Sequence, residues 1–401
     1  MLTPSEAEKL ILANVAPFLR EDCPLAEAQG RVLRADIVAD RDLPPFDRVT
    51  MDGYALRSAA LAAGANVFRV EGTQAAGMRP LKLSDADDAC IEIMTGAVLA
   101  DGADCVVPLE DASRDGGRIT VGRGAAIAPG SSVHRRGSDR RAGEVILRAG
   151  VRLGGREIGV AAAVGASTVT VSARPKIAVV ATGDELVEVD APVAAHQVRR
   201  SNDHALRAAL LAAGYPRIER FHLRDVRHEI EHRLWHIIAE YDVVLIAGGV
   251  SKGKFDFLPA VLDEQGVKKI FQGVAQRPGK PFWFGLTPRR TPVFALPGNP
   301  VSAYTCLHRY VLPALAQASG AAPAEPRVVA LAADFTFRAP LACLLPVTLS
   351  SGARGELLAM PAEPNTSGDL AGLVGTDGFV ELPAEETNFP RGTAARFRPW
   401  M

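Results

Sequence analysis

The feature that most constrains the fold is an alternation of apolar and amphipathic segments over residues 176–317. It begins with "KIAVVA", an apolar run of strand length, and "NDHALRAALLAAG", whose apolar residues recur at helical spacing. The same pairing returns in "RIERFHL" with "VRHEIEHRLWHIIAEY" and in "DVVLIA" with "DFLPAVLDEQG". The strand patterns "KKIFQGVA", "PFWFG" and "PVFAL" follow, with a helix from Pro300. Apolar strands separated by helices predict a parallel sheet that is covered on both faces.

The remaining segments are shorter and favour strands. Residues from about 65 to 130 contain the strand-length runs "CIEIM", "CVVPL" and "RITV", which predict a small β-rich domain. After the linker "ASGAAPAEP", the chain from about Arg327 alternates short strands and turns, as in a small β-barrel or sandwich. Near the N-terminus, Thr3 is expected to cap a helix, with Pro4 in the first turn and Glu6 completing a capping box.

Composition excludes several broad classes. A length of 401 residues predicts two to four domains. The net charge of −1 argues against a broad nucleic-acid or anionic-membrane surface, and no run of about 18 apolar residues predicts a membrane span. The five cysteines are scattered without a C-x-x-C motif, so we expect reduced thiols in a cytoplasmic protein. They are Cys23, Cys90, Cys105, Cys306 and Cys343.

Four unusual loops follow strands of the expected sheet. They are "TGDELVE", "GGVSKGKFDF", "QRPGKP" and "PGNPVS". Ligands of such domains bind outside the carboxyl ends of the strands. Glycines let the backbone approach an anion, and helix N-termini offer free N–H groups. In the last loop, Asn299 is a good N-cap and Pro300 a good first helical residue, so its amides and Ser302 could face an oxyanion.

These loops carry charges of both signs. The lysines are Lys252, Lys254 and Lys280, and the carboxylates are Asp184, Glu185 and Asp256. Lysines suit a phosphorylated ligand, whereas carboxylates would repel it unless a cation such as Mg²⁺ lies between them. Each loop by itself is most simply a turn or a helix cap. Four of them on one sheet favour a binding site for metal-assisted chemistry on a phosphate-bearing molecule.

Two other signals are interpreted as surface features. His228, His232 and His236 recur at the helical spacing that metal sites use. The apolar stripe of that helix, formed by Ile230, Leu234, Ile237 and Ile238, lies on the other side, so the histidines are predicted to face solvent. The segment "HRRGSDRR" has the composition of a solvated basic loop, and this composition by itself does not single out its Asp139.

The ordered motifs resemble the molybdopterin molybdenumtransferase family, the group of MoeA and the gephyrin E domain. They are "PPFDRVTMDGYA", "IMTGAVLADGADCVV", "RRGSDRRAG", "TGDEL", "RSND", "GGVSKGKFDF", "RPGKP" and "LPGNPVS". Several of these motifs are weak singly, but their order and spacing over essentially the whole chain are specific.

The resemblance implies a multidomain α/β plus β fold. A central parallel α/β domain at residues 175–320 would bind molybdopterin, and a β-barrel would occupy residues 325–401. An elongated N-terminal domain would combine residues 1–48 and 131–174, around a small β-rich domain at residues 49–130. Members form homodimers whose site lies between the α/β domain of one subunit and N-terminal loops of the other.

The implied activity belongs to molybdenum cofactor biosynthesis. Such an enzyme inserts molybdate into adenylylated molybdopterin and releases AMP, with Mg²⁺ required. The implied location is cytoplasmic. The implied transient partners are a molybdopterin adenylyltransferase and molybdoenzymes, with no nucleic acid and no membrane.

Site residues are carried over from the family motif by motif. The catalytic group would be Asp52, Thr95, Asp139, Glu185, Asp225 and Asp256, with Glu185 and Asp256 also as metal ligands. The substrate- and phosphate-binding group would be Thr182, Gly183, Asp184, Ser201, Gly248, Gly249, Ser251, Arg277, Lys280, Pro297, Gly298, Asn299, Ser302 and Ser367.

The chain departs from the family pattern at several positions. Val49 and Thr50 replace a frequent Ser-Ala, "GSD" replaces "GED", and Arg277 stands where Lys or Gln is common. Members often carry a "GR..F" motif early in the C-terminal domain, whose Arg helps to hold molybdate, whereas this chain has Leu341. Either another Arg substitutes or molybdate handling differs. One alternative is a non-catalytic molybdopterin-binding or scaffold paralogue. Another is a nucleotide pyrophosphatase, but the long N-terminal half that matches the transferases argues against it.

Overall fold

The chain forms two compact units in the computed structural model, which describes residues 1–124, 126–249, 257–323 and 325–400. The first unit comprises residues 1–34, 149–154 and 169–401, and the second comprises residues 35–148 and 155–168. The backbone therefore passes between the units four times, after residues 34, 148, 154 and 168. The division into four domains stays a prediction.

A six-stranded sheet forms the centre of the first unit, in the order β16-β13-β17-β21-β20-β18. Its strands are β13 (Ile177–Thr182), β16 (Ile218–Leu223), β17 (Val243–Ala247), β18 (Lys268–Gln272), β20 (Trp283–Leu286) and β21 (Pro292–Leu296). The four strands β16, β13, β17 and β21 are mutually parallel, as predicted. Only β20 runs against its neighbours, because residues 287–291 are too few for the crossover that a parallel pair with β21 needs.

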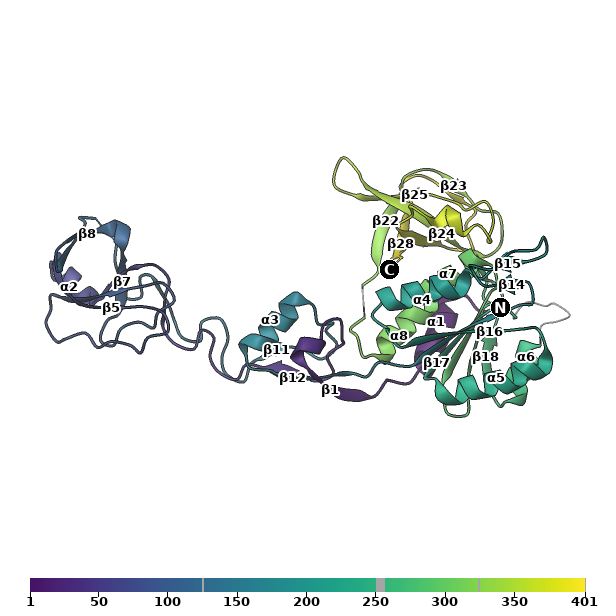
Figure 1. Cartoon of the computed structure of the whole chain (residues 1–401). Helices are drawn as coiled ribbons and strands as arrows, with labels where there is room; N and C mark the ends of the chain where they lie inside the picture. The colour runs from purple at the N-terminus through teal and green to yellow at the C-terminus, as the bar shows by residue number, and fades with distance from the viewer. Residues whose placement is uncertain (125, 250–256, 324, 401) are drawn as a thin grey trace. The chain divides into compact units, whose positions relative to one another are not determined.

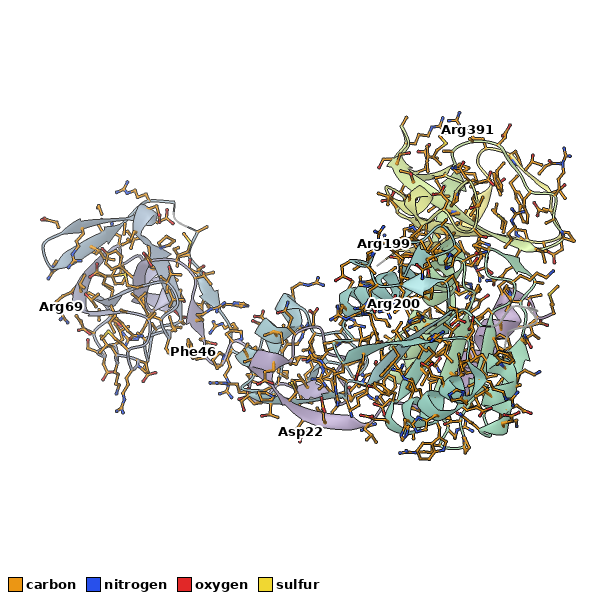
Figure 2. All side chains as sticks on the ribbon, turned by 45° about the vertical axis from the view of Figure 1, so that its right-hand side comes forward. Asp22, Phe46, Arg69, Arg199, Arg200 and Arg391 are labelled. Carbon is orange, nitrogen blue, oxygen red and sulfur yellow. The ribbon has the colours of Figure 1, made fainter. Side chains whose placement is uncertain are left out.

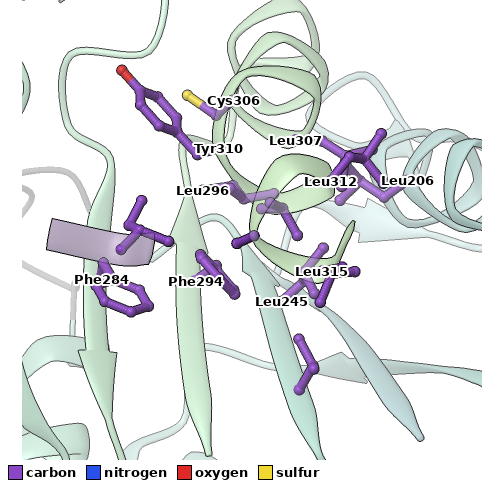
Figure 3. Packing of buried hydrophobic residues seen from close by; sticks show 14 of the residues in the cluster. Leu206, Leu245, Phe284, Phe294, Leu296, Cys306, Leu307, Tyr310, Leu312 and Leu315 are labelled. Carbon is purple, nitrogen blue, oxygen red and sulfur yellow. The ribbon is translucent and has the colours of Figure 1, made fainter. Parts of the chain in front are cut away.

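Helices cover both faces of this sheet, which confirms the predicted α/β class (Figure 1). They are α1 (Pro4–Asn14), α4 (Asn202–Ala212), α5 (Arg227–Glu240), α6 (Leu258–Glu264), α7 (Pro300–Cys306), the π-helical turn η3 (Leu307–Val311) and α8 (Leu312–Ala318). Apolar side chains of α1, α4, α7, η3 and α8 pack on one face, where Leu245 and Phe294 of the strands meet Leu312 and Leu315 (Figure 3). Helices α5 and α6 pack on the other face through Leu234 and other apolar residues.

The N-terminal helix is capped as its sequence predicts. The Thr3 hydroxyl accepts a hydrogen bond from the backbone N–H of Glu6, while the Glu6 carboxylate accepts one from the backbone N–H of Thr3. Ala7 and Ile11 bury the inner side of the helix against the sheet. The prediction for the three histidines of α5 is also confirmed, since His228, His232 and His236 are exposed.

A closed five-stranded barrel ends the chain, so the barrel alternative of the sequence prediction is the correct one. Its strands are β22 (Arg327–Leu331), β24 (Ala342–Ser351), β25 (Leu357–Pro361), β26 (Gly378–Leu382) and β28 (Ala394–Pro399). The ring closes because β24 pairs with both β25 and β26. The short strand β19 (Gln276–Arg277) adds to the edge of β24, and the 3-10 turn η4 (Leu370–Leu373) precedes β26.

Smaller elements complete the first unit. Paired two-stranded sheets are formed by β1 (Arg20–Pro24) with β12 (Thr168–Ser172), β14 (Leu186–Val187) with β15 (Val198–Arg199), and β23 (Phe335–Thr336) with β27 (Asn388–Phe389). A 3-10 turn, η1 (Leu25–Glu27), follows β1. Of these, β14 and β15 matter for the site below.

The second unit contains the predicted β-rich domain. Its six-stranded sheet has the order β7-β4-β6-β5-β9-β8. The strands are β4 (Gly53–Leu56), β5 (Val67–Gln74), β6 (Ala89–Ile93), β7 (Cys105–Pro108), β8 (Ala112–Asp115) and β9 (Arg118–Val121). Also present are β2 (Ile37–Val38), β3 (Arg48–Val49), β10 (Val133–His134), β11 (Val145–Leu147), α2 (Ser58–Ala62), η2 (Leu109–Asp111) and α3 (Gly155–Ala163). Two apolar clusters fill the two faces of the sheet.

The cysteines and the longest apolar helices also bear on predictions from the sequence. All five cysteines are free and buried, as expected of reduced thiols, and burial raises the pKa of the Cys90 thiol to about 12. No helix in the described part of the chain is both long enough and apolar enough to cross a membrane.

Candidate functional site

A cavity of about 710 Å³ opens at the carboxyl ends of the parallel strands. Three of the four predicted loops contribute several lining residues each, and the fourth contributes only Pro281. The lining residues include the predicted Thr182, Gly183, Glu185, Ser201, Asp225, Gly248, Gly249, Pro297, Gly298 and Asn299. This is the edge where ligands of doubly wound domains bind, and where the sequence predicted a site; the roles of these residues stay predictions.

Two glycines shape the floor of the cavity. Gly248 and Gly249 follow β17 with φ values of +107° and +68°, which side chains rarely adopt. A Cβ at Gly248 would lie 2.7 Å from Oγ1 of Thr182 and 2.9 Å from its carbonyl oxygen. The Thr182 side chain is 6% exposed, and its hydroxyl has no hydrogen-bond partner in the described part of the chain. The close approach of the two loops therefore leaves a buried polar group at the cavity wall.

Two carboxylates line the same cavity. Glu185 folds back over Gly183, where an added Cβ would lie 2.5 Å from Oε2 of the glutamate. The Gly183 carbonyl is fixed from the other side, because Nε2 of His222 donates a hydrogen bond to it at 2.9 Å. Asp225, in the loop after β16, is the second carboxylate. The cavity thus combines close backbone approach with oxygen ligands of the type that hard cations prefer.

Helix α7 begins at the cavity and is joined there to the barrel. The amide nitrogen Nδ2 of Asn299 donates to Oγ of Ser367 at 2.8 Å, and the backbone N–H of Val301 donates to the Ser367 carbonyl at 3.1 Å. The neighbouring Gly368 lines the cavity. Ser367, a weak candidate from sequence, therefore positions a barrel loop over the start of α7.

A wall of the cavity that the sequence interpretation missed comes from β14, β15 and the start of α4. Leu186, Val198, Arg199, Arg200, Asn202 and Asp203 line it. The backbone N–H of Val198 donates to the Glu185 carbonyl, and that of Arg200 donates to the Val187 carbonyl, both at 2.9 Å. These bonds pair β15, which leads into Arg200, with β14, which follows Glu185; Arg199 and Arg200 are labelled in Figure 2. The signal was the pair of arginines directly before the "SND" helix start, from which only Ser201 had been selected.

Other predicted residues of the first unit do not line the cavity. Asp184 is exposed and accepts hydrogen bonds from Nε of Arg224 at 3.4 Å and from the backbone N–H of Asp225 at 3.2 Å. Arg277 lies in β19, which pairs with β24 at the barrel edge, and Lys280 of the same loop is exposed. Ser302 is buried within α7. Their roles stay predictions.

Ser251 and Asp256, together with Lys252 and Lys254, lie outside the described residues.

The three N-terminal candidates all belong to the second unit. Oδ1 of Asp52 accepts two hydrogen bonds from Thr95, from the backbone N–H at 2.6 Å and from the hydroxyl at 2.7 Å. These bonds, led by the backbone one, lower the pKa of Asp52 although its carboxylate is exposed. Asp139 pairs with Nε2 of His134 at 3.0 Å. The structure thus couples Asp52 to Thr95 directly, whereas their catalytic role stays a prediction.

The cavity can be tested for its fit to Mg²⁺. Among the described residues, no group of three His, Cys, Asp or Glu side chains is arranged to hold a metal ion. Magnesium usually takes one or two carboxylates and completes its shell with water and substrate phosphate. Glu185 and Asp225, which line one cavity, could supply those carboxylates. The described residues do not form a complete metal site from protein ligands alone.

Comparison with known sequences assigns the family. The molybdopterin molybdenumtransferase of Synechocystis sp. is 38% identical over 401 residues, covering 100% of both chains. This chain belongs to the molybdopterin molybdenumtransferase family. It is thereby a member of a transferase family of molybdenum cofactor biosynthesis. The molybdopterin molybdenumtransferase of Staphylococcus epidermidis is 30% identical, covering 98% of this chain and 94% of its own.

Three regions of the chain match regions that are characteristic of this family. The MoeA N-terminal region (domain I and II) matches residues 2–165, the probable molybdopterin binding domain matches residues 178–317, and the MoeA C-terminal region (domain IV) matches residues 328–400. A solved molybdopterin biosynthesis MoeA protein from Pyrococcus horikoshii is similar, with a TM-score of 0.83 and 30% identity, covering 100% of this chain and 99% of its own. The cavity lies within the region matched by the molybdopterin binding domain, apart from Gly368.

Proposed function

We propose that this chain inserts molybdate into adenylylated molybdopterin and releases AMP in a Mg²⁺-dependent step. The observation that carries the proposal is the placement of Glu185 and Asp225 beside the glycine turns of β13 and β17, in one cavity. The family membership agrees with it. A phosphate-bearing pterin needs close backbone approach, and its negative charge needs a cation between it and the carboxylates.

The residues have different tasks in this proposal. The glycine turns at Gly183 and Gly248 let the phosphate-bearing part approach the backbone. Glu185 and Asp225 hold the cation, with Asp256 as a further predicted ligand. When bound, Mg²⁺ would neutralise charge that develops on the departing phosphate. Asn299 and Ser367 keep the cavity edge in place.

The assembly around the site is also part of the proposal. A cytoplasmic homodimer would bring Asp52, Thr95 and Asp139 of one subunit to the cavity of the other. A molybdopterin adenylyltransferase would supply the substrate, and molybdoenzymes would receive the product. These partners follow from the chemistry, because an adenylylated pterin must be made by one enzyme and its metal-loaded product must be accepted by another.

The test is AMP release by the purified protein from adenylylated molybdopterin and molybdate. We expect release with Mg²⁺ and none in chelator, and full-rate turnover in chelator would contradict the metal requirement. Glu185→Ala should lower turnover more than it lowers AMP affinity, because the residue would act through the metal and the leaving group. Equal losses of both, or no loss, would count against that role.

One observation favours a second function, that of a non-catalytic molybdopterin-binding or scaffold paralogue. Leu341 stands where related chains often carry an Arg for molybdate, and it packs against the apolar core of the barrel. An apolar side chain there offers no hydrogen bond to an oxyanion. Tight binding of adenylylated molybdopterin without any AMP release would favour this alternative.

A further inference from the structure

Glu185 occupies the third position of a four-residue turn at the edge of the cavity. The turn runs from Gly183 to Leu186, and the backbone N–H of Leu186 donates a hydrogen bond to the Gly183 carbonyl at 3.4 Å. This distance is longer than that of an ordinary N–H···O bond. The bond that closes the turn therefore contributes little by itself to the position of Glu185.

A shorter bond to the same carbonyl comes from a histidine side chain. His222, in β16, donates from Nε2 to the Gly183 carbonyl at 2.9 Å. Because a carbonyl oxygen can only accept, Nε2 must carry the proton, as it does in one of the two neutral tautomers and in the imidazolium. His222 does not itself line the described cavity. An effect of His222 on the cavity would therefore act through the turn.

The position of the Glu185 carboxylate depends on the same glycine. The carboxylate packs so closely over Gly183 that a Cβ added there would lie 2.5 Å from Oε2 and 2.8 Å from Oε1. The φ value of Gly183 is +141°, and without a restraint a glycine can adopt many other conformations. Rotation of the Gly183 backbone would displace the turn and the side chain that packs over it. A donor that fixes the Gly183 carbonyl therefore also fixes the carboxylate.

His222 is itself well placed to hold the turn. It is half-buried and lies opposite Ala181 in the parallel pairing of β16 with β13. Its carbonyl accepts a hydrogen bond from Nη1 of Arg233 in α5 at 3.0 Å. The backbone N–H of Gly183 donates to the carbonyl of the next residue, Leu223, at 3.3 Å. The donor thus stands on a regular strand that is fixed on two sides, so its bond restrains the turn and not the reverse.

We propose that His222 is a positioning residue for Glu185. It donates to the Gly183 carbonyl and thereby holds the Glu185 carboxylate where a divalent cation binds. The inference rests on the proposed function, in which Glu185 and Asp225 hold the cation, and it adds a side chain that touches neither cation nor substrate. The role requires a donor at Nε2, so a side chain of the same length without a donor should weaken cation binding.

The test compares His222→Met with His222→Gln. Both new side chains are unbranched and reach as far from the backbone as Nε2 of histidine, but only glutamine keeps a donor there. The probe is Mn²⁺ as a substitute for Mg²⁺, titrated in the presence of AMP and followed by electron paramagnetic resonance. Because the turn loses its shorter hydrogen bond, we expect His222→Met to raise the dissociation constant of Mn²⁺ about fivefold or more. His222→Gln should stay within about twofold of wild type.

The rescue by glutamine separates positioning from a general structural role, which either substitution would disturb. His236→Met, at an exposed histidine of α5, controls for Mn²⁺ bound by surface histidines and should also stay within about twofold. Equal Mn²⁺ affinities of wild type and His222→Met would overturn the proposal. So would a His222→Gln protein as weak as His222→Met, or the absence of measurable Mn²⁺ binding to the wild-type protein with AMP.

A second measurement uses the wild-type protein, so it stands even if His222→Met does not fold. In protein with isotope-labelled histidine, the ring signals of His222, assigned by their loss in His222→Gln, should show a proton on Nε2 at pH 8. An Nε2 without a proton could not donate to the Gly183 carbonyl, and this result would also overturn the proposal.

Failure of the inference differs from failure of the proposed function. Mn²⁺ binding that depends on the donor at position 222, without AMP release from adenylylated molybdopterin, would reject the proposed function and keep the positioning role. AMP release by His222→Met at the wild-type rate and with the wild-type dependence on Mg²⁺ would reject the positioning role and keep the proposed function.

Discussion

At the scale of single residues, Asp52 and Thr95 form the best-defined pair among the N-terminal candidates. Thr95 donates two hydrogen bonds to one carboxylate oxygen, which lowers the pKa of Asp52 in the folded protein. The backbone N–H has the larger effect and the hydroxyl the smaller. The carboxylate is therefore held ionised and oriented, as a metal ligand or a hydrogen-bond acceptor would need to be.

Thr95→Val tests this pair through pH. The variant keeps the backbone donor and loses the hydroxyl, so the pKa of Asp52 should rise only part of the way to the ordinary aspartate value. A lowered folded-state pKa stabilises the fold above the unfolded-state pKa, and that stabilisation disappears as the pH falls through the folded-state pKa. The free energy of unfolding of the variant should thus decrease less on acidification than that of the wild-type protein. NMR titration of the carboxyl carbons checks this, with Asp104, bound by Ser58, as the unchanged reference. An Asp52 titration identical to that of wild type would contradict the role of the hydroxyl.

At the scale of elements, the turn after β17 is set by contact between two loops. Gly248 donates its N–H to the Leu296 carbonyl at 3.1 Å and faces the Thr182 backbone too closely for any side chain. At Gly298, which lies next to Gly248, an added Cβ would lie 3.7 Å from the Gly248 Cα, which is an ordinary van der Waals contact. The two glycines therefore differ in what they tolerate, although both line the same cavity.

Gly248→Ala should destabilise the protein by about 2 kcal/mol or more, because it combines backbone strain with a steric clash. Gly298→Ala should change the free energy of unfolding by less than about 0.5 kcal/mol. Urea denaturation of both variants measures the difference. Similar stabilities for the two would show that the close approach at Thr182 is easily relieved.

The element scale also shows what sequence could predict. Apolar runs such as "KIAVVA" specified buried strands, and the helices between them specified that the sheet is covered. A cavity at the carboxyl ends of the strands could therefore be predicted. The apolar sequence of β20 did not predict that the strand is antiparallel to its neighbours, because its direction depends on the length of the loop to β21. Arg200 was missed because its burial results from pairing with Asp203 and Glu188, side chains that meet only in the folded chain. Lys280 was selected for its charge, but of its loop only the neighbouring Pro281 lines the cavity, and Lys280 itself is exposed.

At the scale of the whole molecule, a buried ion cluster joins the barrel to the α/β layers. Arg309, in η3, is 1% exposed, with Nη1 2.8 Å from Oε1 of Glu8 in α1 and Nε 2.8 Å from Oε2 of Glu381 in β26. Arg398 in β28 lies 3.0 Å from the same Glu8 oxygen. Among the described residues, Nε and Nη1 of Arg309 make no well-directed hydrogen bond, whereas its Nη2 donates one to Oε1 of Glu381 at 3.4 Å.

Arg309→Met should lower the free energy of unfolding by about 3 kcal/mol, because the two glutamates keep their partly buried charges and lose their main cation. Arg391→Met, at an exposed arginine of the barrel, is the control and should change it by less than about 0.5 kcal/mol. Thermal and urea unfolding measure both variants. An Arg309→Met protein as stable as the control would mean that apolar packing alone holds these elements together.

The packing of α1 has a consequence for the order of events during synthesis on the ribosome. The Leu2 carbonyl accepts a hydrogen bond from Ala275, and the Leu12 carbonyl accepts one from Gln317, so the segment that carries α1 has partners about 300 residues later. At about 5–20 residues per second, these partners emerge roughly 15–60 s after the helix. The second unit, complete by residue 168, has no such delay. We expect stalled nascent chains to acquire protease resistance in residues 35–168 while residues 1–14 are still cleaved, so that α1, although synthesised before the second unit, reaches its native position after it.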